Sequence, residues 1–89
     1  MDQYETIDEQ VAVLVGFDKD KKPSIRPFKL RWHDRDYIIT EISHYYRLRE
    51  GRKTIHVISV NDGLNFFELR FESENLTWRL GRVSNNEVH

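Results

Sequence analysis

Apolar and polar side chains alternate along several short runs of this sequence, and Gly, Pro, Asn and Asp residues separate the runs. Alternation with a period of two is typical of β-strands, whose successive side chains point to opposite faces of a sheet. No segment shows the apolar stripe that an amphipathic helix needs. The pattern therefore predicts an all-β fold, a six-stranded antiparallel meander. Its expected strands are residues 10–18, 24–32, 37–49, 54–60, 64–72 and 76–84.

The length of the chain suits one domain. Its 89 residues, 38% of them hydrophobic, supply one modest core. We expect a single domain over residues 1–89, with an acidic N-terminal segment at 1–9, the meander at 10–84 and a tail at 85–89. The absence of cysteine excludes disulfide bonds and thiol chemistry. The sequence has neither a long apolar run nor a signal-peptide pattern, so we expect a cytoplasmic protein without a membrane segment.

Turn chemistry predicts how neighbouring strands align. Residues 61–63 (Asn-Asp-Gly) suit a three-residue loop, which would place Val57 opposite Phe67. Residues 51–52 (Gly-Arg) suit a two-residue type II′ turn, which would place Tyr46 opposite Val57. The predicted interior side chains are Phe28, Leu30, Trp32, Ile38, Thr40, Ile42, Tyr46, Leu48, Ile55, Val57, Phe67, Leu69, Phe71, Leu76, Trp78 and Leu80.

The remaining hairpins follow from the same reasoning. A loop at residues 34–36 would place Lys29 opposite Glu41, and a turn at 73–74 would join the last two strands. Pro27 then falls on the outer face of its strand, where its missing N–H predicts a sheet edge or a bulge. Six strands of this length form a small barrel, a roll or a strongly curved sheet, and the sequence does not distinguish among them.

The predicted alignment leaves one apolar row on the outer face of the sheet. Its members are Ile25, Tyr45, Ile58, Phe66 and Gly81, with Val60 and Leu64 beside the row. Such a row marks a contact with another chain or a surface that the same chain covers. The N-terminal segment, which carries Tyr4 and Ile7, is one candidate cover, and a protein partner or a second copy of the chain is the other.

Basic residues gather in the middle of the chain. Residues 21–53 contain ten Lys and Arg against four Asp and Glu, although the net charge of the whole chain is −1. Small β-barrels bind single-stranded nucleic acid on exposed aromatic rings within a basic groove. The candidate contacts are Lys29, Arg31, Arg47, Arg49 and Arg79. We also expect a row of cross-strand ionic neighbours, formed by Arg47, His56, Glu68 and Arg79.

No pattern in the sequence is typical of catalysis or cofactor binding. His33, His44 and His56 lie on different predicted hairpins without the spacing of metal ligands. Residues 33–36 (His-Asp-Arg-Asp) suit a turn, and the glycines suit turns or bulges rather than a phosphate-binding loop. We therefore expect a non-enzymatic interaction module with no cofactor, no metal and no small-molecule substrate. A protein partner or homo-oligomer is the first expectation, and nucleic acid is the alternative because the overall charge is not basic.

Three motifs resemble those of a small bacterial domain family of unknown function. The three segments are residues 28–39 (FKLRWHDRDYII), residues 62–69 (DGLNFFEL) and residues 78–83 (WRLGRV). The family patterns that they resemble are, in the same order, F-R-W-x-G-R-x-Y-x-V, D-G-x-x-F/Y-E-L and W-x-L-x-R-V. The resemblance covers residues 23–84, and Asp34 departs from it by standing where the family turn has glycine. Some relatives occur with DNA-repair proteins, which adds to the nucleic-acid expectation. The resemblance implies no catalytic residue.

Overall fold

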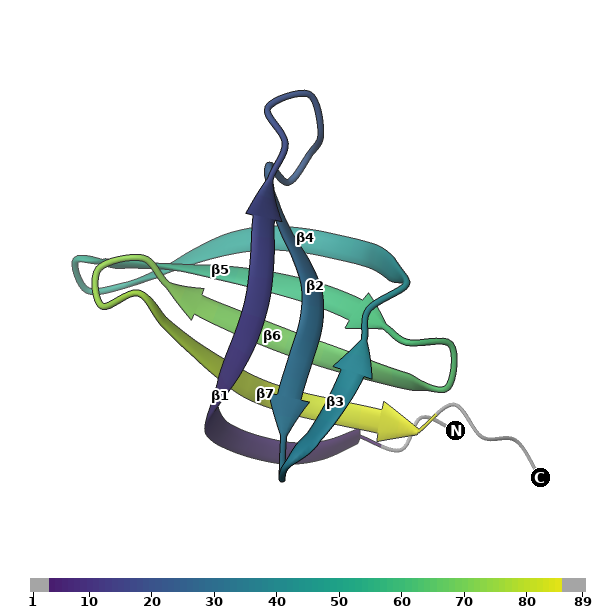
Figure 1. Ribbon diagram of the computed structural model, residues 1–89. Coiled ribbons are helices and arrows are strands. Elements are labelled where there is room, and N and C mark those ends of the chain that lie inside the picture. Colours follow the sequence, from purple (N-terminus) through teal and green to yellow (C-terminus); the bar gives the residue numbers. More distant parts are fainter. Residues whose placement is uncertain (1–3, 86–89) are drawn as a thin grey trace.

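Seven antiparallel strands form the structure, a computed structural model that describes residues 4–85 (Figure 1). They are β1 (Tyr4–Phe17), β2 (Ile25–Trp32), β3 (Arg35–Ile38), β4 (Glu41–Glu50), β5 (Lys53–Asn61), β6 (Asn65–Glu72) and β7 (Thr77–Asn85). Their order in the sheet is β3-β2-β1-β7-β6-β5-β4. The predicted all-β antiparallel class is confirmed. The described residues contain no helix, and hence none able to cross a membrane.

Strand β1 joins the two layers of the molecule. Its first half pairs with β7, from Tyr4 opposite Ser84 to Val11 opposite Trp78, and its second half pairs with β2. The register with β7 shifts next to Asp8, whose φ of 54° bends the strand. The hairpin of β1, β2 and β3 consequently crosses over the sheet of β4 to β7, and the fold does not close into a barrel (Figure 1).

Two predictions about strand number and order are wrong. Residues 4–9 belong to β1 rather than to a separate segment, and Ile7 packs against the core as part of that strand. Strand β1 lies between β2 and β7, so the sheet is not a simple meander. The predicted strand at 37–49 divides into β3 and β4 at residues 39–40. There the Ile39 N–H bonds to β2 and the Thr40 N–H bonds to β5, so the chain passes from one layer to the other. Residues 1–3 and most of the predicted tail lie outside the described residues.

The core lies between the two layers. We call the sheet faces that meet there the inner faces and the opposite ones the outer faces. The buried core side chains are Leu30, Ile58, Val60, Phe67, Leu69, Trp78 and Leu80. Full burial of one such aliphatic or aromatic side chain stabilises the fold by roughly 1.5–3 kcal/mol. The prediction of Leu30, Phe67, Leu69, Trp78 and Leu80 as interior is confirmed.

The register of β5 against β6 differs from the predicted register by an odd number of residues. Asn61 pairs with Phe66, so four residues rather than three form the loop. The Asp62 carboxylate closes it by accepting hydrogen bonds from the N–H groups of Leu64 and Asn65, at 2.9 and 2.7 Å. Burial alone would raise the pKa of Asp62, but these hydrogen bonds outweigh burial and lower it. The odd shift reverses the faces of β5 relative to β6, which turns Ile58 inward.

The other three turns give one confirmation and two corrections. Residues 51–52 form the predicted two-residue turn, with Gly51 at φ 64° and Tyr46 opposite Val57. Residues 33–34 form a two-residue turn in which both have positive φ, as in type I′, so Lys29 faces Ile38 instead of Glu41. The turn between β6 and β7 spans residues 73–76 rather than 73–74.

These turns explain which predicted core side chains are exposed instead. Phe28, Ile38 and Leu76 are 53%, 60% and 76% exposed. Phe28 occupies a bulge that the sequence placed at Pro27, where the register of β2 with β1 shifts. Pro27 itself is buried opposite Val15 rather than on the outer face.

Candidate functional site

The predicted outward apolar row does not exist as a surface. Ile58 is fully buried in the core, and Ile25 and Tyr45 pack against it from β2 and β4. Phe66 is 36% exposed, but it directly precedes buried Phe67 on β6 and therefore lies on the opposite face from Ile58. The register of β5 against β6 separates these side chains, so the four predicted contact residues do not form one site.

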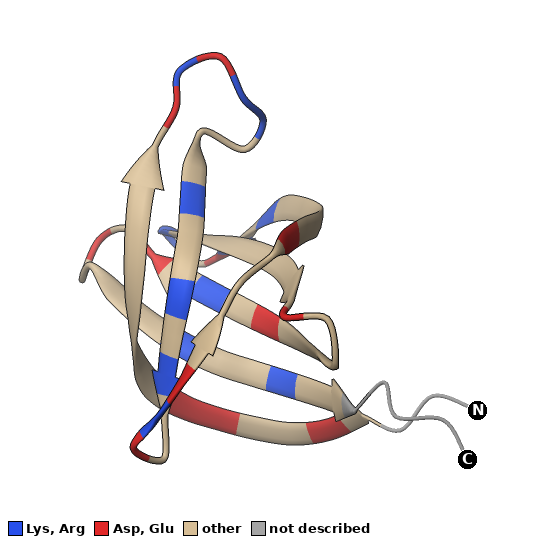
Figure 2. Cartoon of the chain, turned by 45° about the vertical axis from the view of Figure 1, so that its right-hand side comes forward, with Lys and Arg blue, Asp and Glu red and all other residues tan. Residues whose placement is uncertain are grey.

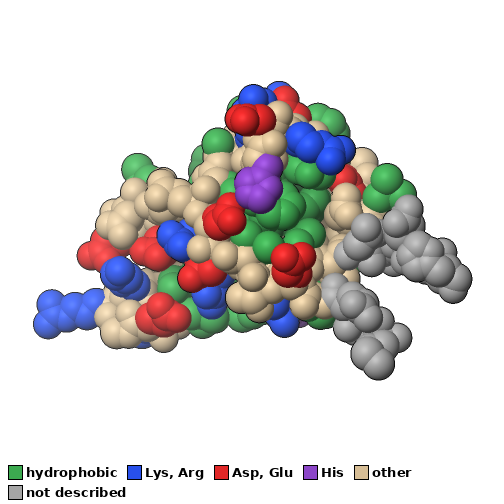
Figure 3. Space-filling view, turned by 90° about the horizontal axis from the view of Figure 1, so that it is seen from below, with side chains coloured by type: hydrophobic (Ala, Val, Ile, Leu, Met, Phe, Trp, Pro, Cys, Tyr) green, Lys and Arg blue, Asp and Glu red, His purple; other side chains and the backbone are tan. Residues whose placement is uncertain are grey.

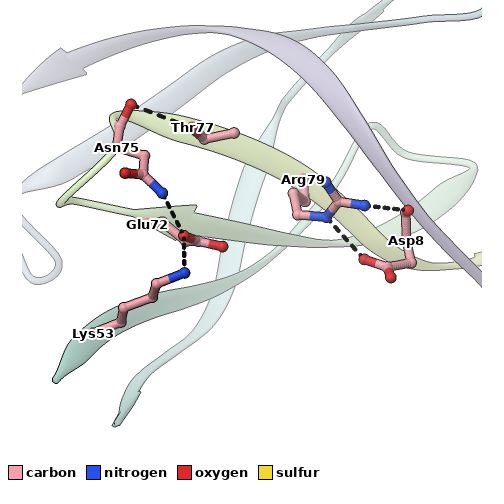
Figure 4. Close-up of polar contacts among 6 residues, drawn as sticks. All are labelled: Asp8, Lys53, Glu72, Asn75, Thr77 and Arg79. Atoms are coloured by element: carbon pink, nitrogen blue, oxygen red, sulfur yellow. Dashed lines mark hydrogen bonds and ion pairs between the residues drawn. The ribbon is translucent and has the colours of Figure 1, made fainter. Parts of the chain in front are cut away.

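The predicted basic contacts fall into two groups: those on outer faces, which bind carboxylates, and those on the inner face of β4. On the outer face of β2, Lys29 and Arg31 both pair with Asp36, at 3.9 and 2.8 Å. On the outer face of β7, Arg79 binds the side chain and backbone carbonyl of Asp8 (Figure 4). Arg47 and Arg49, by contrast, follow Tyr45 at alternate positions along the inner face of β4.

The predicted ionic row is correct at one place. Arg47 lies opposite His56. Glu68 instead binds Arg82 at 2.8 Å, and Arg79 lies opposite Arg70. The odd register of β5 against β6 is again the cause, because it places Phe71 rather than Glu68 beside His56.

A cleft opens at the end of the core, between the loop of residues 18–24 and the inner faces of β4, β5 and β6. Its volume is about 580 Å³, which lies within the usual range for ligand sites. Bases and aromatic rings dominate its walls. The lining side chains are Phe17, Lys19, Lys21, Lys22, Pro23, Ser24, Ile25, Tyr45, Arg47, His56 and Phe71. We call this feature the basic cleft.

Backbone hydrogen bonds order the loop that forms one wall of the basic cleft. The Asp18 N–H donates to the Ser24 carbonyl, and the Asp18 carbonyl accepts from the Lys21 N–H, at 2.9 and 3.2 Å. The Asp18 carboxylate accepts from the Asp20 N–H at 3.0 Å. The loop is therefore ordered by backbone contacts that do not use the ammonium groups of Lys21 and Lys22, whereas the Lys19 ammonium pairs with Asp20.

Aromatic contacts order the opposite wall. The Tyr45 hydroxyl and His56 Nδ1 share a hydrogen bond of 2.8 Å, and their rings stack at 5.9 Å. Phe71 packs beside His56 at 6.1 Å. Burial, and secondly the Arg47 charge, lower the pKa of His56 below 6.5, so His56 is uncharged at neutral pH. The ring of Tyr45 is thus held by His56, which in turn packs beside Phe71.

Carboxylates are absent from the lining of the basic cleft. Within residues 4–85, no ion pair involves Lys21, Lys22 or Arg47, although Lys19 pairs with adjacent Asp20. By contrast, carboxylates hold Lys29, Arg31, Lys53, Arg79 and Arg82 on the outer faces. Figure 2 shows the mixed charges of the loop and the acidic residues along the first half of β1.

Sequence reasoning missed the loop side of this cleft. Phe17 and the lysines of residues 19–22 were not among the predicted contacts. The signal was present as three lysines in a turn directly after an aromatic residue. What the sequence lacked was the crossing of β1 and β2 over the other layer, which brings this loop to Tyr45 and Arg47.

A second hollow, of about 540 Å³, lies beside the turn between β2 and β3. Glu9 accepts a hydrogen bond from Trp32 Nε1 at 3.1 Å and lies 3.3 Å from His33 Nε2. Seen from this end of the molecule, hydrophobic side chains lie at the centre with acidic ones around them (Figure 3). Among the described residues, no three His, Asp or Glu side chains gather as metal ligands do.

Comparison of the chain with protein-family models, with curated proteins and with solved structures gave no match. The resemblance of its three motifs to a bacterial domain family therefore stays a prediction, and the geometry alone supports the functional assignment.

Proposed function

We propose that this protein is a non-enzymatic module that binds nucleic acid in the basic cleft. The observation that carries the proposal is one hollow that combines four Lys or Arg side chains and three aromatic rings with no carboxylate. Phosphates neutralised by Lys and Arg release counterions, which favours binding, and aromatic side chains offer stacking surfaces to bases.

The net charge of −1 is compatible with this proposal because the charges are separated in space. Carboxylates on the outer faces neutralise Arg31, Arg79 and Arg82. The local field in the cleft is set mainly by Lys21, Lys22 and Arg47, whose charges no ion pair offsets within the described residues. Oxygens of a phosphate backbone would satisfy these groups.

Fluorescence anisotropy with labelled oligonucleotides tests the proposal. Single-strand binding loses affinity with salt at a log–log slope of about −0.7 per phosphate contacted, so four bases predict a slope of roughly −3. Arg47→Gln should weaken binding severalfold. Arg35→Gln is the matched control, because it removes an equal charge from β3, next to the turn opposite the cleft (Figure 1).

Two outcomes would overturn the assignment. One is the absence of binding to any oligonucleotide at low salt. The other is displacement of a bound oligonucleotide by polyglutamate at equal charge concentration, since an acidic polypeptide would then suit the cleft as well as nucleic acid does.

A second candidate function, self-association, rests on a different surface. Leu14, Phe28 and Ile38 are each more than half exposed on the outer face of β1, β2 and β3. Lys29 lies between Leu14 and Ile38 in the register, 3.9 Å from Asp36. A two-fold copy would place each lysine near the other copy's aspartate while it buries the apolar side chains.

Sedimentation velocity over a range of protein concentrations tests self-association. A dimer that Ile38→Asp abolishes supports this surface, with Leu64→Asp as the control because Leu64 is equally exposed in the loop between β5 and β6. A monomer at every concentration removes the candidate.

A further inference from the structure

The exposed ring of Phe17 is the feature of the basic cleft that charge alone does not explain. Phe17 ends β1 at the rim of the cleft and is 77% exposed, the most exposed of the large hydrophobic side chains described. Removing this ring from water would be favourable, because burial of apolar surface stabilises a complex. A bound partner with a flat apolar face would supply that burial.

Tyr45 offers a second ring surface within the same hollow. Its hydroxyl is held by His56 at 2.8 Å, and its ring packs against the core. A ring held in advance loses little conformational freedom when a ligand stacks on it. The cleft therefore has one free ring at its rim, Phe17, and one fixed ring on its opposite wall.

The basic residues continue beyond the rings. Arg47 also lines an adjoining hollow of about 300 Å³ with Leu48, Arg49 and Thr54. The positive side chains thus follow a path from Lys22 in the loop, past Arg47, to Arg49 near the end of β4. A chain with regularly spaced phosphates fits this path better than a single anion does.

These observations distinguish unpaired from paired nucleotides. Bases in a duplex stack on one another inside the helix and present only their edges in the grooves, so a ring on a concave wall cannot stack on them. Unpaired bases stack readily on aromatic side chains while their phosphates follow a basic groove.

We infer that the basic cleft takes single-stranded nucleic acid, with bases stacked on Phe17 and Tyr45 and phosphates bound along the path of Lys22, Arg47 and Arg49. This inference rests on the proposed function and adds the strandedness of the ligand and the division of labour in the cleft. Any base can stack on an aromatic ring, so we expect the site to discriminate little between nucleotide sequences.

A comparison of intact with abasic oligonucleotides separates stacking from charge. Anisotropy is measured with a single strand, its blunt duplex, and an abasic strand of equal length that keeps every phosphate. The single strand should bind at least fivefold more tightly than either, because stacking is worth roughly 1–3 kcal/mol per base. Phe17→Ala should weaken binding of the intact strand about fivefold or more and leave the abasic strand unchanged.

Matched variants control for the fold. Phe17→Trp keeps a ring and should retain binding, whereas Leu76→Ala removes an equally exposed apolar side chain from another turn and should have no effect. Equal affinities for the single strand, duplex and abasic strand, all dependent on Arg47, would overturn the inference and leave the proposed function standing. Absence of binding to all three would remove the proposed function as well.

Discussion

The basic cleft and the outer face of β6 and β7 both carry arginines, but carboxylates hold two of the three arginines on the outer face. On the outer face, Arg79 is held by Asp8, and Lys53 reaches Glu72 from the neighbouring strand (Figure 4). Arg82 is held by Glu68 on the same face. In the cleft, Lys22 and Arg47 take part in no ion pair within the described residues. The position of the carboxylates, and not the number of bases, therefore distinguishes a surface that can bind an anion.

The pairs on the outer face contribute little to stability. Exposed ion pairs of this kind are worth roughly 0.2–1 kcal/mol each, because water screens them. Their larger effect is to remove net charge from that face. The two regions thus differ in the field that they present to a ligand more than in what they contribute to folding.

The contrast between the cleft and the outer face depends on which side chains of β5 face the interior. The substitution Ile58→Ala tests this orientation and has the largest expected effect. Ile58 is fully buried, so its truncation should lower the free energy of unfolding by about 2–5 kcal/mol in urea titration. Leu76→Ala should cost less than about 0.5 kcal/mol, because Leu76 is exposed. The sequence-based register expected the reverse order, and observing that order would restore the outward apolar row.

The salt dependence of binding is the next test, since it counts the free charges of the cleft. Replacing Lys21 and Lys22 together with Gln should make the log–log slope shallower by about 1.4, or 0.7 for each lost phosphate contact. Lys53→Gln should leave the slope unchanged, because Lys53 is engaged with Glu72 at 3.7 Å on the outer face. A shift of similar size in both variants would mean that the two regions do not differ.

Protonation of His56 should have a smaller effect, and one of opposite sign on stability and on oligonucleotide affinity. Its pKa is lowered from 6.5 by burial and by Arg47, so below about pH 6.5 the unfolded chain takes up protons before the folded one does. Stability should therefore fall as the pH drops through that window. A bound phosphate would favour the protonated ring, so affinity should rise over the same window.

NMR titration of the His56 ring with and without an oligonucleotide measures both effects. Binding should raise the pKa of His56, and His56→Gln should remove this part of the pH dependence. Arg47→Gln in the free protein should raise the same pKa, because Arg47 contributes to its depression. A pKa that does not respond to the oligonucleotide would place the ligand outside the cleft.

The sequence predicted the strand class and the inner faces of β6 and β7 correctly, because alternation within a strand is a local property, but it reversed the faces of β4 and β5, so that Tyr46 is 41% exposed rather than interior. The face of Leu69, Phe71, Trp78 and Leu80 was correct even though the turn before β7 is longer than expected, since the error was an even number of residues. The error at the Asp62 loop was odd, because Val57 lies opposite Arg70 rather than Phe67, three residues from the predicted register, and this placed Ile58 on the wrong side.

The candidate site was less predictable because it forms between distant segments. Arg47 and Arg49 were predicted as nucleic-acid contacts, but Lys29, Arg31 and Arg79 were grouped with them without knowledge of their carboxylate partners. The pairing of β1 with β7 places Asp8 on Arg79, and it also turns the loop of residues 18–24 toward β4. Alternation along single strands contains no information about such a crossing.

Asp8→Asn gives the smallest expected effect and isolates the charge of one outer pair. Asparagine tolerates the positive φ of 54° at this position, so the bend in β1 should persist while the ion pair with Arg79 is lost. The free energy of unfolding should fall by roughly 0.2–1 kcal/mol, with Lys19→Gln as a control at the fully exposed pair with Asp20. Oligonucleotide affinity at moderate salt should change by less than twofold. Arg79 lies on the outer face of the sheet and does not line the basic cleft, so it is not near the rings of that cleft. A larger gain in affinity would show that freeing an arginine anywhere on the surface is sufficient, and that the rings of the cleft add nothing.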